Sequence, residues 1–286
     1  MKRKPRLPKH GYADKRFLVP ASFGREIRVL VVGCGGSGSE MVDALVRLHA
    51  SARGIGHAGI QLTLQDGDDV SPANVGRARF LPNDVGANKA ALLARRYGLL
   101  FGMDIAALTH RCSARGIRAF GSRYDLVITC TDSASFRVGV ADHWRRRATD
   151  TLWLDLGNGS ATGQSVLGSL GLPAWGPRLP NVLDLFPGIR SMPDDNKPSC
   201  SMAEALRSQN LFVNRWVVDA AVAMLWRLIA EGFVEHHGAL VDMRALKMTP
   251  ITINANTWSF FGFTEAVAGA PCPDAASPAL HRRRAA

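Results

Sequence analysis

Residues 29–39 (VLVVGCGGSGS) constrain the fold of this chain more than any other stretch. Four consecutive apolar residues without polar alternation predict a short buried strand, and an apolar-periodic helix is expected after the glycines. The order is therefore strand, glycine turn, helix. Glycine allows a backbone to approach phosphate oxygens closely, and the N-terminus of a helix offers free N–H groups to an anion.

The glycines fit two patterns that imply different chemistry. Gly33, Gly35 and Gly38 match the dinucleotide fingerprint G-x-G-x-x-G. With Gly36 and Ser39 the same stretch also matches the tighter pattern G-x-G-G-x-G-S. The rest of the sequence must decide between redox chemistry and phosphate chemistry.

Strands and helices alternate through the first half of the chain and predict an α/β fold. Such alternation gives a Rossmann-like, doubly wound, mostly parallel sheet, and ligands bind at the carboxyl ends of its strands. The expected strands are 28–32, 60–64, 103–108, 126–130, 152–156 and 165–170, and the expected helices are 39–50, 88–99, a segment through Arg137 and Trp144, and 213–230. A C-terminal helix and β-hairpin, the hairpin spanning 239–254, extend this fold.

We expect one domain with basic ends. Residues 171–199 are rich in proline and glycine and have little periodicity, which predicts a long crossover-type loop in this part of the chain. The predicted parts are a basic arm (1–26), a nucleotide-binding domain (27–170), the crossover loop carrying Cys200 (171–214), a helix and hairpin completing the same domain (215–265), and a basic tail (266–286).

Composition and charge exclude several classes of protein. Apolar residues make up 47% of the 286 and charged residues 21%, and the most hydrophobic helix, 213–230, contains three charged side chains. We therefore expect a cytoplasmic protein with no membrane contact. The net charge of +11 is concentrated at the chain ends and at residues 145–147. Solvated tails are the favoured interpretation, and nucleic-acid binding by these tails stays open as the alternative.

Cysteine and histidine spacing gives no metal centre. The five cysteines are scattered without a C-x-x-C pair, so neither a zinc site nor a disulfide framework is expected. The pair His236-His237 follows the predicted helix 213–230. We expect these histidines to interact with the negative end of that helix rather than with a metal.

Charged residues after the predicted strands favour phosphate chemistry. Asp66 follows the strand 60–64 and is placed to hold a ribose. Triphosphate cleavage requires cations on the oxygens that gain charge, and Arg77 and Lys89 provide them. Asp132 suits magnesium, which is bound through one or two carboxylates plus phosphate oxygens. Taken singly, these residues are better explained as surface or helix-capping groups, but taken together and in this order they are not.

The motifs occur in one order along the chain: Gly33-x-Gly35-Gly36-x-Gly38-Ser39, Asp66-x-Asp68-x-Val70-x-x-x-Asn74-x-x-Arg77, Asp84-Val85-Gly86-x-x-Lys89 and Asp125-Leu126-Val127-Ile128-x-Cys130-Thr131-Asp132. This set resembles the ThiF/MoeB/ubiquitin-activating enzyme family over about residues 28–165. The distal part, with Pro198-Ser199-Cys200-Ser201 and Gln209-Asn210-Leu211-Phe212-Val213-Asn214, resembles the ThiF-like member of PRTRC gene cassettes.

The resemblance implies an enzyme that uses ATP and magnesium to adenylate the C-terminal carboxylate of a ubiquitin-like or sulfur-carrier-like protein. It makes 27–170 the ATP-binding adenylation domain, favours a homodimer, and suggests other cassette proteins as partners. Asp132 is carried over as the magnesium ligand, and Gly36 is expected to allow close backbone approach to the triphosphate. The residues carried over as ATP-binding are Gly33, Gly35, Gly36, Gly38, Ser39, Asp66, Asp68, Asn74, Arg77 and Lys89, and those carried over as catalytic are Arg77, Lys89, Asp132 and Cys200.

The chain departs from the family pattern in three places. The family's Arg-Gln pair is Arg77-Ala78, the zinc-binding cysteine pairs are missing, and the arginine lent to a partner subunit has no clear counterpart. The first change removes one polar contact, and the third puts completion of the site by a second subunit in doubt.

Cys200 and the overall function each have alternatives. Cys200 precedes a predicted helix and follows Lys197, which favours a thiolate that accepts the acyl group as a thioester. A loop thiol without a role is the competing interpretation. For the whole chain, the alternatives to adenylation are an NAD-dependent oxidoreductase, which rests only on the glycine pattern, and a non-catalytic nucleotide-binding scaffold of a gene-cassette complex.

Overall fold

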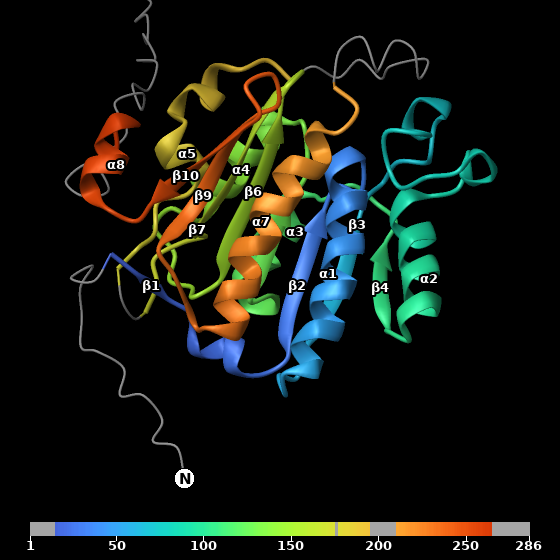
Figure 1. Cartoon of the computed structure of the whole chain (residues 1–286), viewed down its shortest axis with the longest axis horizontal. Helices are drawn as coiled ribbons and strands as arrows, with labels where there is room; N and C mark the ends of the chain where they lie inside the picture. The colour runs from blue at the N-terminus through green and yellow to red at the C-terminus, as the bar shows by residue number, and fades with distance from the viewer. Residues whose placement is uncertain (1–14, 175–176, 195–209, 265–286) are drawn as a thin grey trace, which may run out of the picture.

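A mixed sheet with helices on both faces organises the residues that the computed structural model describes, 15–174, 177–194 and 210–264 (Figure 1). The strand order is β10-β9-β7-β6-β5-β2-β3-β4; the strands from β6 to β4 are parallel, and β7, β9 and β10 are antiparallel. This arrangement confirms the predicted Rossmann-like α/β fold. The strands are β2 (Ile27–Val32), β3 (Ile60–Gln65), β4 (Ile105–Leu108), β5 (Leu126–Thr129), β6 (Leu152–Asn158), β7 (Thr162–Ser169), β9 (His236–Asp242) and β10 (Lys247–Thr252).

The central strand β2 is apolar because it has no solvent side. Val29 pairs with Leu62 of β3 on one side and with Leu126 of β5 on the other. None of residues 29–32 is more than 6% exposed. A parallel strand that is covered on both faces has a continuous run of apolar residues, and this run is the pattern from which β2 was predicted.

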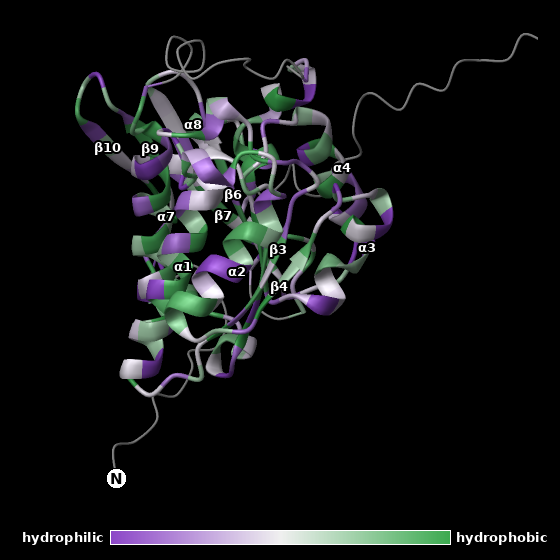
Figure 2. Cartoon of the chain, turned by 90° about the vertical axis from the view of Figure 1, so that its right-hand side faces the viewer, coloured by the Kyte–Doolittle hydropathy of each residue, from purple (hydrophilic) through white to green (hydrophobic). Residues whose placement is uncertain are grey.

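Helices α1 (Gly36–Gly54) and α7 (Val213–Ala230) pack side by side on one face of the sheet, while α3 (Ala114–Arg123) and α4 (Ala134–Trp144) cover the other (Figures 1 and 2). α2 (Lys89–Phe101) contacts α1 and the edge strand β4. The N-terminal ends of α1 and α7 lie at the same end of the sheet, above the carboxyl ends of the parallel strands (Figure 1). Within the described ranges, no helix has the length and apolar composition that crossing a membrane requires.

Several elements differ from those predicted. The helix after the glycine turn begins at Gly36 rather than Ser39, because the turn residues themselves adopt helical backbone. α3 was not predicted, and the segment 171–199 contains α5 (Val182–Leu185), whose first N–H groups are capped by Asn181, and a 3₁₀-helix (Pro187–Ser191). The predicted hairpin is confirmed as β9 and β10, and the short helix α8 (Ala255–Phe260) follows it.

Part of the predicted N-terminal arm packs against the domain. β1 (Phe17–Leu18) pairs with β8 (Phe233–Val234), and the side chain of Phe23 is buried. Burial of these aromatic side chains attaches residues 17–23 to the domain, although this part of the sequence has little periodicity.

His237 lies within β9 and not at the end of a helix, so the predicted interaction with the helix dipole is wrong for this residue. Its ring is fully buried, with Nδ1 2.8 Å from the carbonyl oxygen of Leu167 and Nε2 2.8 Å from the indole N–H of Trp258. A carbonyl only accepts, so Nδ1 carries the proton and Nε2 accepts from the indole. Burial lowers the pKa of His237 to about 4.

We expect His237 to make folding less stable as the pH falls from about 6.5 toward 4. In the unfolded chain histidine titrates near its ordinary pKa of about 6.5, so in this window the unfolded state binds a proton that the folded state does not. Urea unfolding between pH 7 and 4 measures the decline. The variant His237→Gln, which cannot be protonated, should decline less steeply; an equal slope would show that other groups cause the loss.

Candidate functional site

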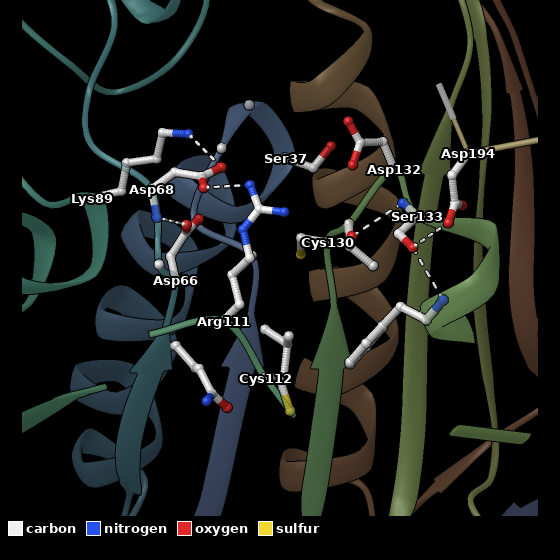
Figure 3. A pocket seen from close by; sticks show the side chains of 18 of the residues that line it. Ser37, Asp66, Asp68, Lys89, Arg111, Cys112, Cys130, Asp132, Ser133 and Asp194 are labelled. Carbon is white, nitrogen blue, oxygen red and sulfur yellow. Dashed lines mark hydrogen bonds and ion pairs between the residues drawn. The ribbon is translucent and has the colours of Figure 1, made fainter. Parts of the chain in front are cut away.

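A cavity of about 840 Å³ lies at the carboxyl ends of β2, β3 and β5 and collects most of the predicted site residues (Figure 3). In Figure 3, Lys89, Asp68, Asp66 and Arg111 lie on the β3 side, and Asp132, Ser133 and Asp194 on the β5 side. The predicted residues that line the cavity are Gly33, Gly35, Gly36, Asp66, Asp68, Asn74, Arg77, Lys89 and Asp132. Gly38 and Ser39 are not in the lining, and Cys200 lies outside the described residues.

Gly33 and Gly38 are required by the packing of the turn itself. Gly33 has a φ of +89°, and a Cβ there would lie 2.6 Å from the carbonyl oxygen of Cys130. A Cβ at Gly38 would lie 1.9 Å from the carbonyl oxygen of Gly33. Gly35 differs, since a Cβ there meets nothing within 4 Å, so its backbone faces open space.

Gly36 and Ser39 also have structural partners. A Cβ at Gly36 would lie 2.5 Å from the side-chain nitrogen of Asn214 in α7. This contact gives Gly36 a packing reason that differs from the expected approach to a triphosphate. The Ser39 hydroxyl donates to the carbonyl of Gly36 at 3.1 Å and accepts the N–H of Arg79 at 3.1 Å. Ser39 therefore holds the turn against the loop that follows β3.

Asp66 connects the glycine turn to the loop after β3. Its Oδ2 accepts the N–H of Cys34 at 2.6 Å, and its Oδ1 accepts the N–H of Asp68 at 2.8 Å. Burial raises the pKa of Asp66, while the two N–H groups and the charge of Lys89 act in the opposite direction. The carboxylate is thus a structural acceptor that still borders the cavity.

Lys89 places a nearly buried cation at the cavity. Its Nζ lies 3.5 Å from Oδ2 of Asp68, and its side chain is only 11% exposed. A cation in the first turn of a helix is unfavourable to the helix dipole, so α2 itself does not account for this lysine. Asn88 caps α2 by accepting the N–H of Ala91, and its Nδ2 donates to the carbonyls of Asp66 and Asp68.

Asn74 and Arg77 lie in the loop after β3. Asn74 is buried, and its Oδ1 accepts the N–H and hydroxyl of Ser71. Nε of Arg77 donates to the carbonyl of Ala73 at 2.9 Å. Burial lowers the pKa of Arg77, and the opposite charge of Asp132 acts against that shift. The guanidinium of Arg79, by contrast, lies 2.8 Å from Glu40 on α1.

The β5 side of the cavity carries Asp132, Ser133 and Asp194. Ser133 caps α4 by accepting the N–H of Phe136 at 3.1 Å, so the N-cap is not Asp132. The Asp194 carboxylate accepts from the hydroxyls of Ser133 and Ser135 and from the N–H of Ser135. These bonds lower the pKa of Asp194. Asp132 remains exposed in the lining, and its carboxylate accepts no hydrogen bond from the described residues.

A buried polar network fixes α4 beneath this side of the cavity. Nε of Arg137 donates to Asp155 at 2.8 Å, and its guanidinium also donates to the carbonyl of Leu156. Thr129 donates to the same carboxylate and accepts the indole N–H of Trp153 at 2.8 Å. Because every member of the network is paired, the buried charges are compensated, and the network holds the N-terminus of α4 at the ends of β5 and β6.

Asp132 fits magnesium only together with groups from a ligand. Among the described residues, no three His, Cys, Asp or Glu side chains are arranged to hold a metal ion. At phosphate sites, however, magnesium usually has only one or two carboxylate ligands from the protein, and Asp132 offers one beside the cavity. The residues present are compatible with a metal that is also held by phosphate oxygens.

Thiols near the cavity are not activated. Burial raises the pKa of Cys34 and of Cys130, and it raises the pKa of Cys112 to about 11. A thiol with a raised pKa is a poor nucleophile at neutral pH. The cavity is therefore suited to binding and polarising an anionic ligand rather than to attack by one of these cysteines.

Part of the cavity lining was not predicted, because segments that are far apart in the sequence supply it. Arg111 and Cys112 precede the unpredicted helix α3, and Asn214 opens α7. Arg111 lies 3.0 Å from Asp68, so this carboxylate has two cationic partners. The one local signal was Ser113, which caps α3 by accepting the N–H of Gly116.

Comparison with known proteins identifies the family. The model of the ThiF family matches residues 24–257. The chain belongs to the ThiF family. This confirms the family resemblance found in the sequence, although the matches do not single out the PRTRC type.

Curated relatives match less than half of this ThiF family chain. It is 33% identical over 131 residues to Ubiquitin-like modifier-activating enzyme 5 of Drosophila grimshawi, which covers 41% of this chain and 30% of the relative. It is 30% identical over 141 residues to Adenylyltransferase and sulfurtransferase UBA4 of Yarrowia lipolytica, covering 46% and 33% of the two chains. The matches thus span about a third of each relative.

Solved structures support the fold over a longer stretch. A crystal structure of E. coli MccB with MccA superposes with a TM-score of 0.56 at 16% identity, covering 82% of this chain and 65% of that one. A structure of PaaA gives a TM-score of 0.53 at 14% identity, with 81% and 65% covered.

We expect Asp66→Asn to lower the free energy of unfolding by about 1–3 kcal/mol, because a buried N–H of the turn loses a charged acceptor. Asp69→Asn is the matched control, since Asp69 is exposed, and we expect it to change stability by less than about 0.5 kcal/mol. Urea unfolding of both variants at pH 7 measures the difference. Equal stability of the two variants would contradict the structural role of Asp66.

Proposed function

We propose that this ThiF family protein uses ATP and magnesium to adenylate the C-terminal carboxylate of a small ubiquitin-like or sulfur-carrier-like protein. The observation that carries the proposal is the lining of one cavity by Arg77, Lys89, Asp132 and the glycine turn, in a chain whose family is established. The names of the curated relatives, a ubiquitin-like modifier-activating enzyme and an adenylyltransferase, support the same reaction.

The proposed reaction joins two anions, which sets the task of the protein. A carboxylate oxygen attacks the α-phosphorus of ATP, a carboxylate–phosphorus bond forms, and the bond to the leaving pyrophosphate breaks. Cations and oriented N–H groups must offset the repulsion between carboxylate and polyphosphate and hold the two groups in line. Lys89, Arg77 and the N-terminus of α1 would bind phosphate oxygens, and Asp66 would hold the ribose.

Asp132 is the residue proposed to hold magnesium. The metal would neutralise charge on the phosphate oxygens when it is bound there. Asp132 is exposed in the lining, whereas the neighbouring Ser133 is occupied as the cap of α4. Of the remaining residues carried over as nucleotide-binding, Asn74 would contact phosphate oxygens, and Asp68 would position Lys89 beside the nucleotide.

Three further parts of the proposal rest on the sequence resemblance alone. These are transfer of the acyl group to Cys200 as a thioester, a homodimeric assembly, and a place among the proteins of a PRTRC gene cassette. Cys200 lies outside the described residues, so its support is its position after Lys197 in the sequence.

Two other functions use the same cavity. An NAD-dependent oxidoreductase is supported only by the glycine pattern, and membership of the ThiF family weighs against it. A non-catalytic nucleotide-binding scaffold would keep the fold without turnover. The exposed carboxylate of Asp132 favours the enzyme, because it lines the cavity without a hydrogen-bond partner among the described residues.

The test is exchange of labelled pyrophosphate into ATP in the presence of candidate carrier proteins. We expect Arg77→Ala and Asp132→Ala to lower the exchange rate at least about 100-fold, since each removes a charge that acts on the reacting phosphates. Arg146→Ala is the matched control, because Arg146 is exposed and outside the cavity, and its rate should be unchanged.

Three results would contradict the proposed function or one of its parts. If ATP binds but no carrier protein supports exchange, the non-catalytic scaffold function holds and the enzymatic function is wrong. Binding of NADH in preference to ATP would favour the oxidoreductase. In the same reactions, a conjugate that an added thiol releases by thioester exchange should be absent in Cys200→Ser; its persistence in that variant would remove the thioester step alone.

A further inference from the structure

The side chain of Asn214, the second residue of α7, is buried at the glycine turn and, among the described residues, forms hydrogen bonds only through its oxygen. It is 3% exposed, and its Oδ1 accepts the Ser37 hydroxyl at 2.9 Å and Nδ2 of Asn158 at 3.0 Å. In this orientation both neighbours donate to the same amide oxygen. Its Nδ2 is buried and has no hydrogen-bond partner within the described residues.

A buried amide nitrogen without an acceptor is costly. Native proteins pair nearly all such groups, and an unsatisfied donor carries the full penalty of desolvation. Asn214 is also among the residues that line the cavity, beside the glycine turn. An acceptor supplied by a ligand would satisfy Nδ2 without disturbing the two bonds at Oδ1.

The surroundings of Asn214 favour a negatively charged acceptor. α1 and α7 run side by side with their N-termini at this end of the sheet, so the positive ends of two helix dipoles converge here (Figure 1). Neither first turn contains an acidic residue, and neither N-cap, Gly35 or Phe212, makes a side-chain capping bond. Within the described residues, neither the first turns nor the N-cap side chains of these two helices compensate their positive ends.

Gly36 provides the space that the amide occupies. A Cβ at this position would lie 2.5 Å from Nδ2 and 2.9 Å from the Cγ of Asn214. Any larger residue at position 36 must displace the amide. The second glycine of the doublet therefore depends on Asn214 as well as on the backbone of the turn.

We propose that Asn214 is a phosphate-binding residue carried by α7, with Nδ2 donating to a phosphate oxygen of the nucleotide and with Ser37 and Asn158 as positioning residues. The proposal rests on the nucleotide site of the proposed function but not on turnover. It adds a donor from the C-terminal half of the chain to a site whose other phosphate contacts come from residues before 133.

The experiment measures the dissociation constants of ATP, inorganic pyrophosphate and adenosine for the full chain and for Asn214→Ala. Loss of a hydrogen bond to a charged group should weaken ATP and pyrophosphate about 10- to 100-fold and leave adenosine within about twofold. Asn158→Ala, which removes only an orienting bond, should have a smaller effect. Thermal unfolding of each variant establishes that it is folded.

Gly36→Ala and the double variant Gly36→Ala/Asn214→Ala separate a direct role from a structural one. If the methyl group acts by displacing the amide, Gly36→Ala should weaken ATP strongly in the wild type and little in the Asn214→Ala background. Equal losses in both backgrounds would show that Gly36 acts through the turn alone. That result would overturn the coupling proposed between the two residues.

Other results of these binding measurements decide whether Asn214 binds phosphate. Unchanged affinity for ATP and pyrophosphate in Asn214→Ala, or equal weakening of adenosine, would overturn the proposal. A wild-type chain that binds neither anion would overturn it together with the proposed function. A wild-type chain that binds ATP through Asn214 but shows no pyrophosphate exchange would retain this inference and remove only the enzymatic function.

Discussion

The two hydrogen bonds accepted by Asp66 determine where the rest of the site lies. One joins the carboxylate to the N–H of Cys34 in the glycine turn at 2.6 Å, and the other to the N–H of Asp68 at 2.8 Å. They connect the ends of the neighbouring strands β2 and β3, so the start of α1 and the loop that holds Lys89 keep a fixed relation. Burial raises the pKa of Asp66, and the N–H groups and Lys89 offset that cost of the ionised form.

The charged side chains on the two sides of the cavity are stabilised in different ways. On the β3 side the charges pair with one another at its edge, as Asp68 does with Lys89 and Arg111. On the β5 side the pair Arg137–Asp155 is buried behind the wall, where it fixes α4 and leaves Asp132 exposed. On the β5 side the buried ion pair is thus separate from the exposed Asp132, whereas on the β3 side Lys89 pairs with Asp68 and also borders the cavity.

The parts predicted from sequence are those with local causes. The apolar run of β2 and the contact of Gly38 with the carbonyl of Gly33 lie within neighbouring residues, whereas the contact of Gly33 with Cys130 depends on the end of β5. α3 was missed because Gly116 and Gly121 interrupt a segment with few apolar residues. Asn214 lies 177 positions from Ser37, and only the packing of α7 on α1 brings the two together. His237 was wrongly placed at a helix end, because the sequence alone does not show where the helix ends and the next strand begins.

We propose that this cavity holds the triphosphate of ATP above the turn at residues 35–37. The most direct measurement is a crystal structure of the full chain with a non-hydrolysable ATP analogue and magnesium. We predict phosphate oxygens within hydrogen-bonding distance of Lys89, the N-terminus of α1 and Nδ2 of Asn214, with the ribose at Asp66 and the metal at Asp132. Phosphates bound away from the turn, or a metal held without Asp132, would contradict it.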